Sequence, residues 1–278
     1  VCTQLAGSHF GFELVHSRHG RREVSMARNL YWLSDEEWAS IQPHLPTGRR
    51  GARRVDDRRV ISGILHMLKT GARWRDCPAD YGPYTTICNR FNRWSKQGVW
   101  EDVFLRPVRL FRGDRHDQCR QHLGQGAPFG QRRKRGDFGN AIGRSRGGRT
   151  TKIHALTDEF GRPVALCLTP GQTHDLTGVA ALLNRVPTPR RLLADRAYDA
   201  KRLRDWPGER GCEAVIPPHP TRKHPHSFDK VAYRARNVVE RMFCRLKDFR
   251  RLATRYDKSA DTFLAAALLV AAVVWWAN

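Results

Sequence analysis

Acidic residues are scarce in this sequence, and paired cysteines of the kind that bind zinc are missing. Asp and Glu number 27 against 50 Lys and Arg, which gives a formal net charge of +23. An excess of this size predicts a polyanionic partner, and nucleic acid comes first because neutralising phosphates releases counterions. The seven cysteines form no CxxC motif, which argues against structural zinc. A chain of 278 residues can bury a core without disulfides.

The sequence also lacks an apolar run long enough to cross a bilayer. Its longest apolar run, residues 263–277, is shorter than the ~20 residues that a membrane span needs, so we interpret it as a buried helix that closes the core. Residues 1–25 carry scattered charges and no apolar segment of a signal peptide. We therefore expect a disordered leader there, with Met26 as an alternative start, and a cytoplasmic protein.

Helical patterning predicts a small all-α domain over residues 26–104. A capping-box pattern at residues 34–37 begins the first helix, and residues 60–68 carry apolar side chains at the spacing of a second helix, which is predicted to stop at Gly71. A third helix is predicted over residues 84–96. Short helices separated by tight turns, with a basic last helix, resemble a helix-turn-helix unit that reads the major groove of DNA. A plain helical bundle with a basic surface explains the same periodicity.

The third predicted helix supplies candidates for DNA contact. Ile87, Phe91 and Trp94 form its apolar stripe, so the other positions are expected to face outward. Asparagine and arginine are the side chains that read adenine and guanine edges. The candidate DNA-binding residues of this helix are Asn89, Arg90, Arg93 and Lys96.

Residues 105–137 form a basic segment in which we find no helical or alternating apolar pattern. Nine of the 32 residues from 105 to 136 are Arg or Lys, and two are acidic. This composition is typical of an irregular linker that can lie on DNA.

From residue 138 to residue 278 the pattern is that of an α/β domain. Two strands are predicted at residues 152–156 and 164–168, joined as a hairpin, and two more at residues 191–194 and 213–216. One helix is predicted at residues 176–185, between the second and third strands, and another after the fourth strand. This order predicts a mixed sheet flanked by helices.

Two carboxylates of this domain stand where chemistry is expected. Asp195 directly follows the strand at 191–194, and ligands of open α/β sheets collect at strand ends of this kind. Glu240 belongs to a Y-x2-R-x3-E-x6-K pattern, whose spacing returns to one helix face. A site of this kind holds a metal ion with the glutamate while its cations receive a phosphodiester. A helix cap at Asp195 and an ordinary ion-paired helix face are the alternatives. The four residues of the pattern are Tyr233, Arg236, Glu240 and Lys247.

Several stretches of the sequence resemble the DDE transposases of bacterial insertion sequences, in the branch called insertion-sequence family five. The similar stretches are WLSDEEWASIQPHLP, GARWRDCPADYGPYTTICNRFNRWSKQGVW, GRSRGGRTTKIHALTDEFGRPVALCLTPGQTHDL, LLADRAYDA and the Y-x2-R-x3-E-x6-K pattern. The resemblance implies an RNase H-like fold for residues 138–278. It implies that Asp195 and Glu240 are catalytic and bind Mg²⁺ or Mn²⁺, and that the accessory, DNA-binding residues are Tyr233, Arg236 and Lys247.

The resemblance also implies what the protein does. It implies binding of the element's terminal inverted repeats, metal-dependent hydrolysis of a phosphodiester at each element end, and strand transfer into target DNA. Two ends must be brought together, so a homodimer or a larger homo-oligomer is expected. The alternative is a non-catalytic DNA-binding relic that represses its own element. A basic RNase H-like nuclease unrelated to transposition is a third interpretation, which gives no reason for the helical domain.

The first catalytic Asp of this family is missing from its expected place upstream of residue 138. Reading the codons for residues 120–130 one nucleotide later permits Asp-Ser-Thr and a family-like continuation, so we hypothesise a shifted reading frame over residues 105–137. The nucleotide sequence across this segment tests the hypothesis, since codons that cannot give Asp-Ser-Thr in the next frame exclude it. Without a first Asp, the remaining pair would bind magnesium weakly. The in-frame substitutes, all in a linker-like context, are Asp114, Asp117 and Asp137.

Overall fold

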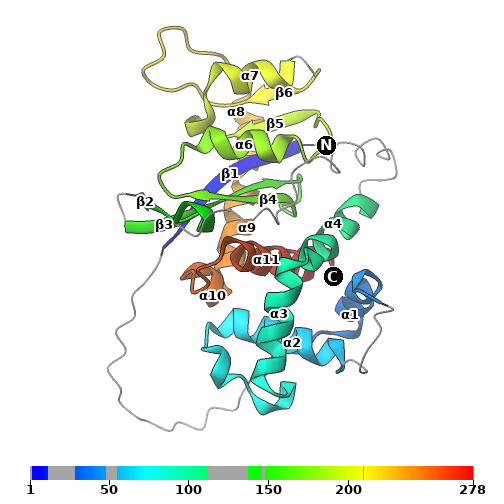
Figure 1. The fold of residues 1–278 in the computed structure, drawn as a ribbon. Coiled ribbons are helices and arrows are strands. Elements are labelled where there is room, and N and C mark those ends of the chain that lie inside the picture. Colours follow the sequence, from blue (N-terminus) through cyan, green and yellow to red (C-terminus); the bar gives the residue numbers. More distant parts are fainter. Residues whose placement is uncertain are drawn as a thin grey trace.

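The protein has a mixed α/β structure. The computed structural model describes residues 2–11, 29–47, 55–111, 137–145, 148–208 and 210–277. One sheet of six strands lies above a group of N-terminal helices, and helix α11 (Ala260–Ala271) lies between the two (Figure 1). A single cluster of buried apolar side chains continues from the helices into the sheet, so the two parts share one core.

The N-terminal helices form where the sequence predicts them. Helix α1 spans Asp35–Ile41, α2 spans Asp57–Thr70 and α3 spans Tyr84–Lys96. The predicted capping box begins α1, because the Ser34 hydroxyl accepts the Glu37 N–H at 3.1 Å and the Glu37 carboxylate accepts the Ser34 N–H at 2.8 Å.

The described parts of the connections between these helices contain short 3-10 turns. They span Gln42–His44, Trp74–Asp76 and Ala79–Tyr81. Helix α2 ends at Gly71, whose φ of 68° lies in the left-handed region that glycine adopts without strain. The stop predicted at this glycine is therefore confirmed.

Helix α4 spans Val99–Phe111 and extends into the segment that the sequence predicts to be irregular. An apolar stripe does continue here, because Val103, Phe104 and Val108 are all buried. The expectation of an irregular chain is therefore wrong for residues 105–111. Pro107 and the neighbouring arginines obscure the stripe, since a proline inside a helix removes one hydrogen bond and argues against a helix. Residues 112–136 lie outside the described residues.

The sheet combines antiparallel and parallel pairs. Strand β3 pairs antiparallel with β4, which confirms the predicted hairpin, and also antiparallel with the short strand β2. Strand β1 lies between β3, with which it pairs antiparallel, and β5, with which it pairs parallel. Strand β6 pairs parallel with β5 on the other side. The strands are β1 (Cys2–Gly11), β2 (Gly143–Ser145), β3 (Gly148–Thr157), β4 (Pro163–Pro170), β5 (Arg191–Ala194) and β6 (Glu213–Val215).

Strand β1 corrects the expectation of a disordered leader over residues 1–25. Residues Cys2–Gly11 lie between β3 and β5, with Leu5 in register with both Leu156 and Ala194. The sequence does not reveal this strand, because pairing uses main-chain groups that every residue carries. Its partners also lie far along the chain. The remainder of the predicted leader, from residue 12, lies outside the described residues.

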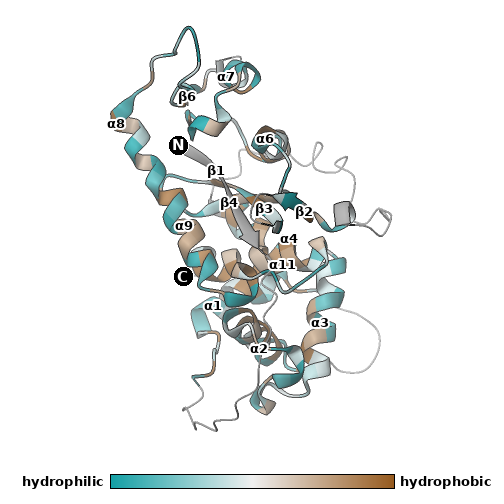
Figure 2. Cartoon of the chain, turned by 90° about the vertical axis from the view of Figure 1, so that its left-hand side faces the viewer, coloured by the Kyte–Doolittle hydropathy of each residue, from teal (hydrophilic) through white to brown (hydrophobic). Residues whose placement is uncertain are grey.

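Helices cover the sheet and extend from its C-terminal edge. Figure 2 shows mostly hydrophilic colouring on the loop before α8 and mixed colouring on α8, whereas α11 is coloured mostly hydrophobic. The predicted helix at residues 176–185 is α6. The helices of this part are α6 (Asp175–Leu183), α7 (Lys201–Gly208), α8 (Lys230–Tyr233), α9 (Asn237–Lys247) and α10 (Arg250–Ala253), followed by α11 and a π-helix at Ala272–Trp276.

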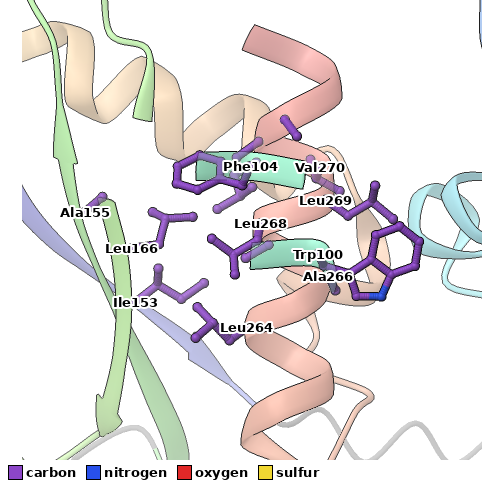
Figure 3. Close-up of a cluster of buried hydrophobic side chains, with 14 of the residues drawn as sticks. Trp100, Phe104, Ile153, Ala155, Leu166, Leu264, Ala266, Leu268, Leu269 and Val270 are labelled. Atoms are coloured by element: carbon purple, nitrogen blue, oxygen red, sulfur yellow. The ribbon is translucent and has the colours of Figure 1, made fainter. Parts of the chain in front are cut away.

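Helix α11 is buried on all sides, as the apolar run of the sequence predicts. Figure 3 shows its residues Leu264 and Leu268 between Ile153 and Leu166 of the sheet and Trp100 of α4 on the other side. A helix that is apolar all round belongs in a core or a membrane. Within the part of the chain that the structure describes, no helix is both long enough and apolar enough to span a bilayer.

A second link between the two parts is polar. The Arg251 guanidinium donates to both carboxylate oxygens of Asp257, at 2.9 and 3.1 Å, and to the Ala72 carbonyl at 3.1 Å. It also lies over the Trp74 ring, 4.7 Å from the ring centre. Arg251 comes after the sheet in the chain, whereas Ala72 and Trp74 follow α2, so this side chain fixes the C-terminal segment to the N-terminal helices.

Candidate active site

Asp195 stands at the end of the central parallel strand, as predicted. Strand β5 ends at Ala194, and Asp195 begins a 3-10 turn over Arg196–Tyr198. Its Oδ1 accepts the Ala197 N–H at 2.9 Å, which holds the carboxylate at the strand end. The capping role that the sequence left open is thus present, and it leaves Oδ2 available.

The charged groups around Asp195 come from three other elements. Burial raises the pKa of Asp195, and the negative charges of Asp175 and Glu240 raise it further. The Ala197 N–H and the Arg236 guanidinium act in the opposite direction. Coulombic interactions weaken with distance, so the groups that shift this pKa lie near Asp195. The structure therefore brings Asp195 and Glu240 into one neighbourhood, although 45 residues of sequence separate them.

Glu240 lies on a helix that is interrupted just before it. Tyr233 ends α8, Arg236 ends a 3-10 turn over Arg234–Arg236, and Glu240 is in the first turn of α9. The Arg236 guanidinium donates to Glu240 Oε1 and lies over the Tyr233 ring at 5.7 Å from its centre. Three members of the predicted pattern are therefore joined by contacts, Tyr233 to Arg236 and Arg236 to Glu240. Lys247 is the last residue of α9 and is exposed, about 10 Å along the helix axis from Glu240.

The Arg236 contact gives Glu240 its orientation. The Arg236 side chain is 18% exposed and the Glu240 side chain 55% exposed, so the carboxylate reaches solvent while its partner is mostly covered. An exposed i, i+4 pair stabilises a helix by only about 0.2–0.5 kcal/mol. Its effect is therefore on position: Arg236 orients the Glu240 carboxylate, and the charges of both side chains act on Asp195.

The described residues do not by themselves form the metal site that the resemblance implies. Among them, no group of three His, Cys, Asp or Glu side chains is close enough to hold one ion. Two-metal phosphoryl transfer uses at least two carboxylates and usually three. Asp195 and Glu240 supply two, with the hard oxygen donors that Mg²⁺ prefers, but Arg236 occupies one oxygen of Glu240.

None of the candidates for the first carboxylate has a side chain among those that the structure describes. The predicted frame-shifted codons, Asp114 and Asp117 fall outside the described residues, and Asp137 lies in a 3-10 turn over Asp137–Asn140 with a side chain that is not described. Strand β1 is the neighbour of β5 on the side of β3. Its sequence, CTQLAGSHFG, contains no acidic residue.

Asp175 is a carboxylate near the site that sequence reasoning missed. It is the first residue of α6, and its Oδ1 accepts the Lys152 ammonium at 2.9 Å. Lys152 is 8% exposed and also donates to the Thr173 carbonyl at 2.8 Å. A buried lysine on a strand was the available signal, since such a side chain needs a partner. Asp175 adds negative charge beside Asp195, and Lys152 compensates it.

Tyr198, three residues after Asp195, is also part of this neighbourhood. Its side chain is buried, and its hydroxyl has no hydrogen-bond partner among the described residues. Burial raises its pKa, and the charges of Asp175 and Asp195 raise it further. The phenol is therefore a neutral donor next to two carboxylates.

Asp199 ends the same turn and is the best-partnered carboxylate of the region. Its side chain is 1% exposed and accepts Arg204 Nε at 2.6 Å, two Arg222 nitrogens at 3.0 and 3.1 Å, and the His219 N–H at 2.6 Å. Burial alone would raise its pKa, but the His219 N–H and then the two guanidinium groups hold the pKa at about 2. Sequence reasoning missed it because its partners lie up to 23 residues away.

The candidate DNA-binding residues of α3 do not share one face. Asn89, Arg93 and Lys96 are exposed and lie at steps of four and three residues, which is one helix stripe. Arg90 is 6% exposed, its guanidinium donates to Asp57, and it lies 4.8 Å from the centre of the Trp94 ring. The prediction that Arg90 contacts DNA is therefore corrected: it is a core residue that joins α3 to α2.

Comparisons with known proteins agree on the family. Residues 117–275 match the family model "Transposase DDE domain", and residues 33–104 match the model "Putative transposase of IS4/5 family". The chain is 34% identical over 127 residues to the "Putative transposase for insertion sequence element IS6501" of Brucella ovis, which covers 45% of this chain and 98% of the relative. No solved structure is significantly similar to this chain.

A second relative comes from Burkholderia cepacia. It is the "Putative transposase for insertion sequence element IS402", 33% identical over 148 residues that cover 49% of this chain and 67% of the relative. The "Insertion element IS402 uncharacterized 16.2 kDa protein" of the same organism is 39% identical over 77 residues, which cover 25% of this chain and 52% of that protein.

Proposed function

Because the chain belongs to the DDE transposases of insertion sequences, we propose that it binds the terminal inverted repeats of its own element and breaks the phosphodiester bond at each element end. The observation that carries this proposal is the meeting of Asp195, at the end of β5, with Glu240, on α9. The mixed sheet, in the order β4, β3, β1, β5, β6, supports an RNase H-like fold.

In this proposal, Asp195 and Glu240 are the catalytic carboxylates. Arg236 holds Glu240 toward Asp195 and, with Tyr233 and Lys247, contacts the DNA backbone through charged and hydroxyl donors. The 3′-hydroxyl released by hydrolysis then attacks target DNA. We propose Mg²⁺ or Mn²⁺ as the cofactor on the chemistry of the two carboxylates. Asp195 and Glu240 would hold this ion, and among the described residues no third carboxylate lies close enough to complete the site.

We propose that the exposed stripe of α3 contacts the terminal repeat. Arginine and asparagine are suited to base edges and lysine to phosphates, and Asn89, Arg93 and Lys96 present these groups on one side of the helix. Transposition joins two element ends, so the partners are duplex DNA and a second copy of this chain.

A cleavage assay tests the catalytic part. The substrate is a labelled duplex with the terminal repeat taken from the DNA that flanks the gene, incubated with the protein and Mg²⁺ or Mn²⁺. We expect a metal-dependent cut at the repeat end that Glu240→Gln reduces by at least about 10²-fold. Glu159→Gln, which changes an exposed carboxylate on the turn between β3 and β4, is the matched control. Equal cleavage by both variants would remove Glu240 from the mechanism.

A second function, a DNA-binding relic that occupies the repeats without cutting them, is favoured by one observation. Among the described residues, no three carboxylates lie close enough to hold one ion, whereas this chemistry usually uses three. The same assay separates the two functions, because the relic binds the repeat duplex in preference to a scrambled duplex and leaves it uncut with either metal. A protein without preference for the repeat contradicts both.

A further inference from the structure

A long loop precedes the helices that carry Arg236 and Glu240. Fourteen residues, 216–229, lie between β6, which ends at Val215, and α8, which begins at Lys230. Loops of this length without secondary structure are uncommon in compact folds, and those that are ordered are usually functional. Four of the residues are prolines, which fix φ and reduce the conformations that the free loop can adopt.

The loop is attached to the turn that follows Asp195. The buried Asp199 carboxylate binds Arg222 and the His219 N–H, in the middle of the loop. Arg204, on the same carboxylate, donates its other nitrogen to the Ile216 carbonyl at 2.8 Å, at the beginning of the loop. One carboxylate thus fixes two points of the loop through charge-assisted hydrogen bonds, which are stronger than neutral ones.

The end of the loop is fixed by an aromatic pair and a helix cap. The Phe228 ring packs edge-on against the Tyr233 ring, with centres 5.6 Å apart and an angle of 85°. The Asp229 carboxylate accepts the Val231 and Ala232 N–H groups at 2.8 and 2.9 Å, which begins α8. The loop therefore has a defined path from the Asp195 turn to the Glu240 helix.

The loop and the segment that follows it, up to residue 236, together present a basic surface. Residues 217–236 contain five Lys or Arg and one acidic residue, Asp229. Arg222 is bound by Asp199 and Arg236 by Glu240, whereas Lys223 and Lys230 are exposed. The exposed side chains of residues 216–229 are polar, charged or proline, and Figure 2 shows this segment in hydrophilic colours. Such a surface suits a polyanion and not an apolar peptide.

We propose that residues 216–229 form a preformed clamp for the phosphate backbone of duplex DNA, attached by Asp199 to the turn that follows Asp195, with Lys223 of the loop and Lys230, the first residue of α8, as the phosphate contacts. The identification of the polyanion as DNA rests on the proposed function. A loop that is already ordered loses little entropy when it binds, and a lysine ammonium is a compact point charge that suits a phosphate. The clamp holds the backbone next to the carboxylates, independently of its base sequence.

The salt dependence of binding tests the two phosphate contacts. The probe is a fluorescent duplex of about 30 base pairs with random sequence, titrated at several salt concentrations. We expect Lys223→Gln/Lys230→Gln to make the slope of log K against log salt shallower by about 2, since each phosphate contact contributes about 0.9. The control Arg190→Gln/Lys258→Gln removes two exposed cations outside the loop. A slope equal to wild type, or an equal change in the control, overturns the proposal.

Proteolysis tests the loop without relying on a substitution. Trypsin cleaves after Arg222 and Lys223, and we expect the duplex to slow this cleavage severalfold. Asp199→Asn should speed cleavage of the free protein, whereas equal cleavage with and without the duplex overturns the clamp. If single-stranded RNA of equal length binds more tightly and shows the larger lysine dependence, the assignment to duplex DNA is overturned.

The outcome is separable from that of the proposed function. Preference for the terminal repeat over a scrambled duplex tests the proposed function, because it needs base contacts. The loop experiment uses random duplex, since phosphates carry no sequence information. A protein can therefore fail either test while it passes the other.

Discussion

At the residue scale, Asp195 shows a conflict between function and stability. Its strand end is partly buried and lies near two other carboxylates, so the ionised form is unfavourable in the fold. Active sites commonly contain charged side chains that destabilise the folded state, so replacing such a side chain often stabilises the protein. Asp195 is the residue of this chain where that expectation has a stated electrostatic cause.

We expect Asp195→Asn to stabilise the protein at neutral pH by about 0.5 kcal/mol, after solvent screening is allowed for. The pKa of Asp195 is higher in the folded protein than in the unfolded chain. Below the unfolded pKa the side chain is neutral in both states and does not destabilise the fold. As the pH rises through the folded pKa, the side chain ionises in the fold and this stability is lost. The gain should therefore vanish at acidic pH. Urea unfolding midpoints at pH 7 and pH 3 check this, and an equal gain at both pH values would contradict it. Asparagine keeps the acceptor for the Ala197 N–H.

At the element scale, α3 separates its cations into two groups. Arg90 points into the core and pairs with Asp57, which is 12% exposed, whereas Arg93 and Lys96 are exposed. The helix therefore serves packing on one side and has a free basic stripe on the other. Charge alone, as written in the sequence, does not distinguish the two groups.

Substitutions on α3 should accordingly split stability from DNA affinity. We expect Arg90→Met to lower the free energy of unfolding by about 3 kcal/mol, because it removes the guanidinium that neutralises the mostly buried Asp57 carboxylate. Arg93→Gln/Lys96→Gln should change stability by less than about 0.5 kcal/mol and weaken binding to the repeat duplex. Thermal unfolding measures the change in stability, and fluorescence anisotropy with a labelled repeat duplex measures the change in binding. A stable Arg90→Met protein would show that the pair is dispensable.

Individual elements also show what the sequence can predict. Tyr84–Lys96 and Arg191–Ala194 form a helix and a strand over the predicted residues, because their periodicity is local and their ends carry glycine, proline or charge. The family resemblance predicts that Asp195 and Glu240 act together, and in the structure the Glu240 charge raises the pKa of Asp195. The burial of Arg90 and the partners of Asp199 depend on chain segments far away in sequence, which no local pattern records.

At the scale of the whole molecule, the sheet and the N-terminal helices are interleaved along the chain. Strand β1 precedes the N-terminal helices and the other five strands follow them. The sheet is therefore complete only when chain segments from before and after these helices pair with each other. Leu5 has a neighbour on each edge, Leu156 and Ala194. Its N–H therefore faces a strand whichever way it points.

We expect Leu5→Pro to destabilise the whole sheet, by more than about 2 kcal/mol, because proline cannot donate to a ladder in a central strand. Leu5→Val, which keeps the N–H and suits a strand, is the control. Chemical unfolding followed by circular dichroism measures both variants. If Leu5→Pro unfolds at the wild-type denaturant concentration, β1 does not hold β3 and β5 together.

The position of β1 has a consequence for synthesis of the protein. Ribosomes add about 5–20 residues per second, so roughly 10–40 s separate the completion of Gly11 from that of Ala194, at the end of its parallel partner. Throughout this interval the strand has main-chain groups without their final partners, a state that favours pairing with other chains. Yield in a host should therefore depend on translation speed and on holding chaperones more than the stability of the finished fold would indicate.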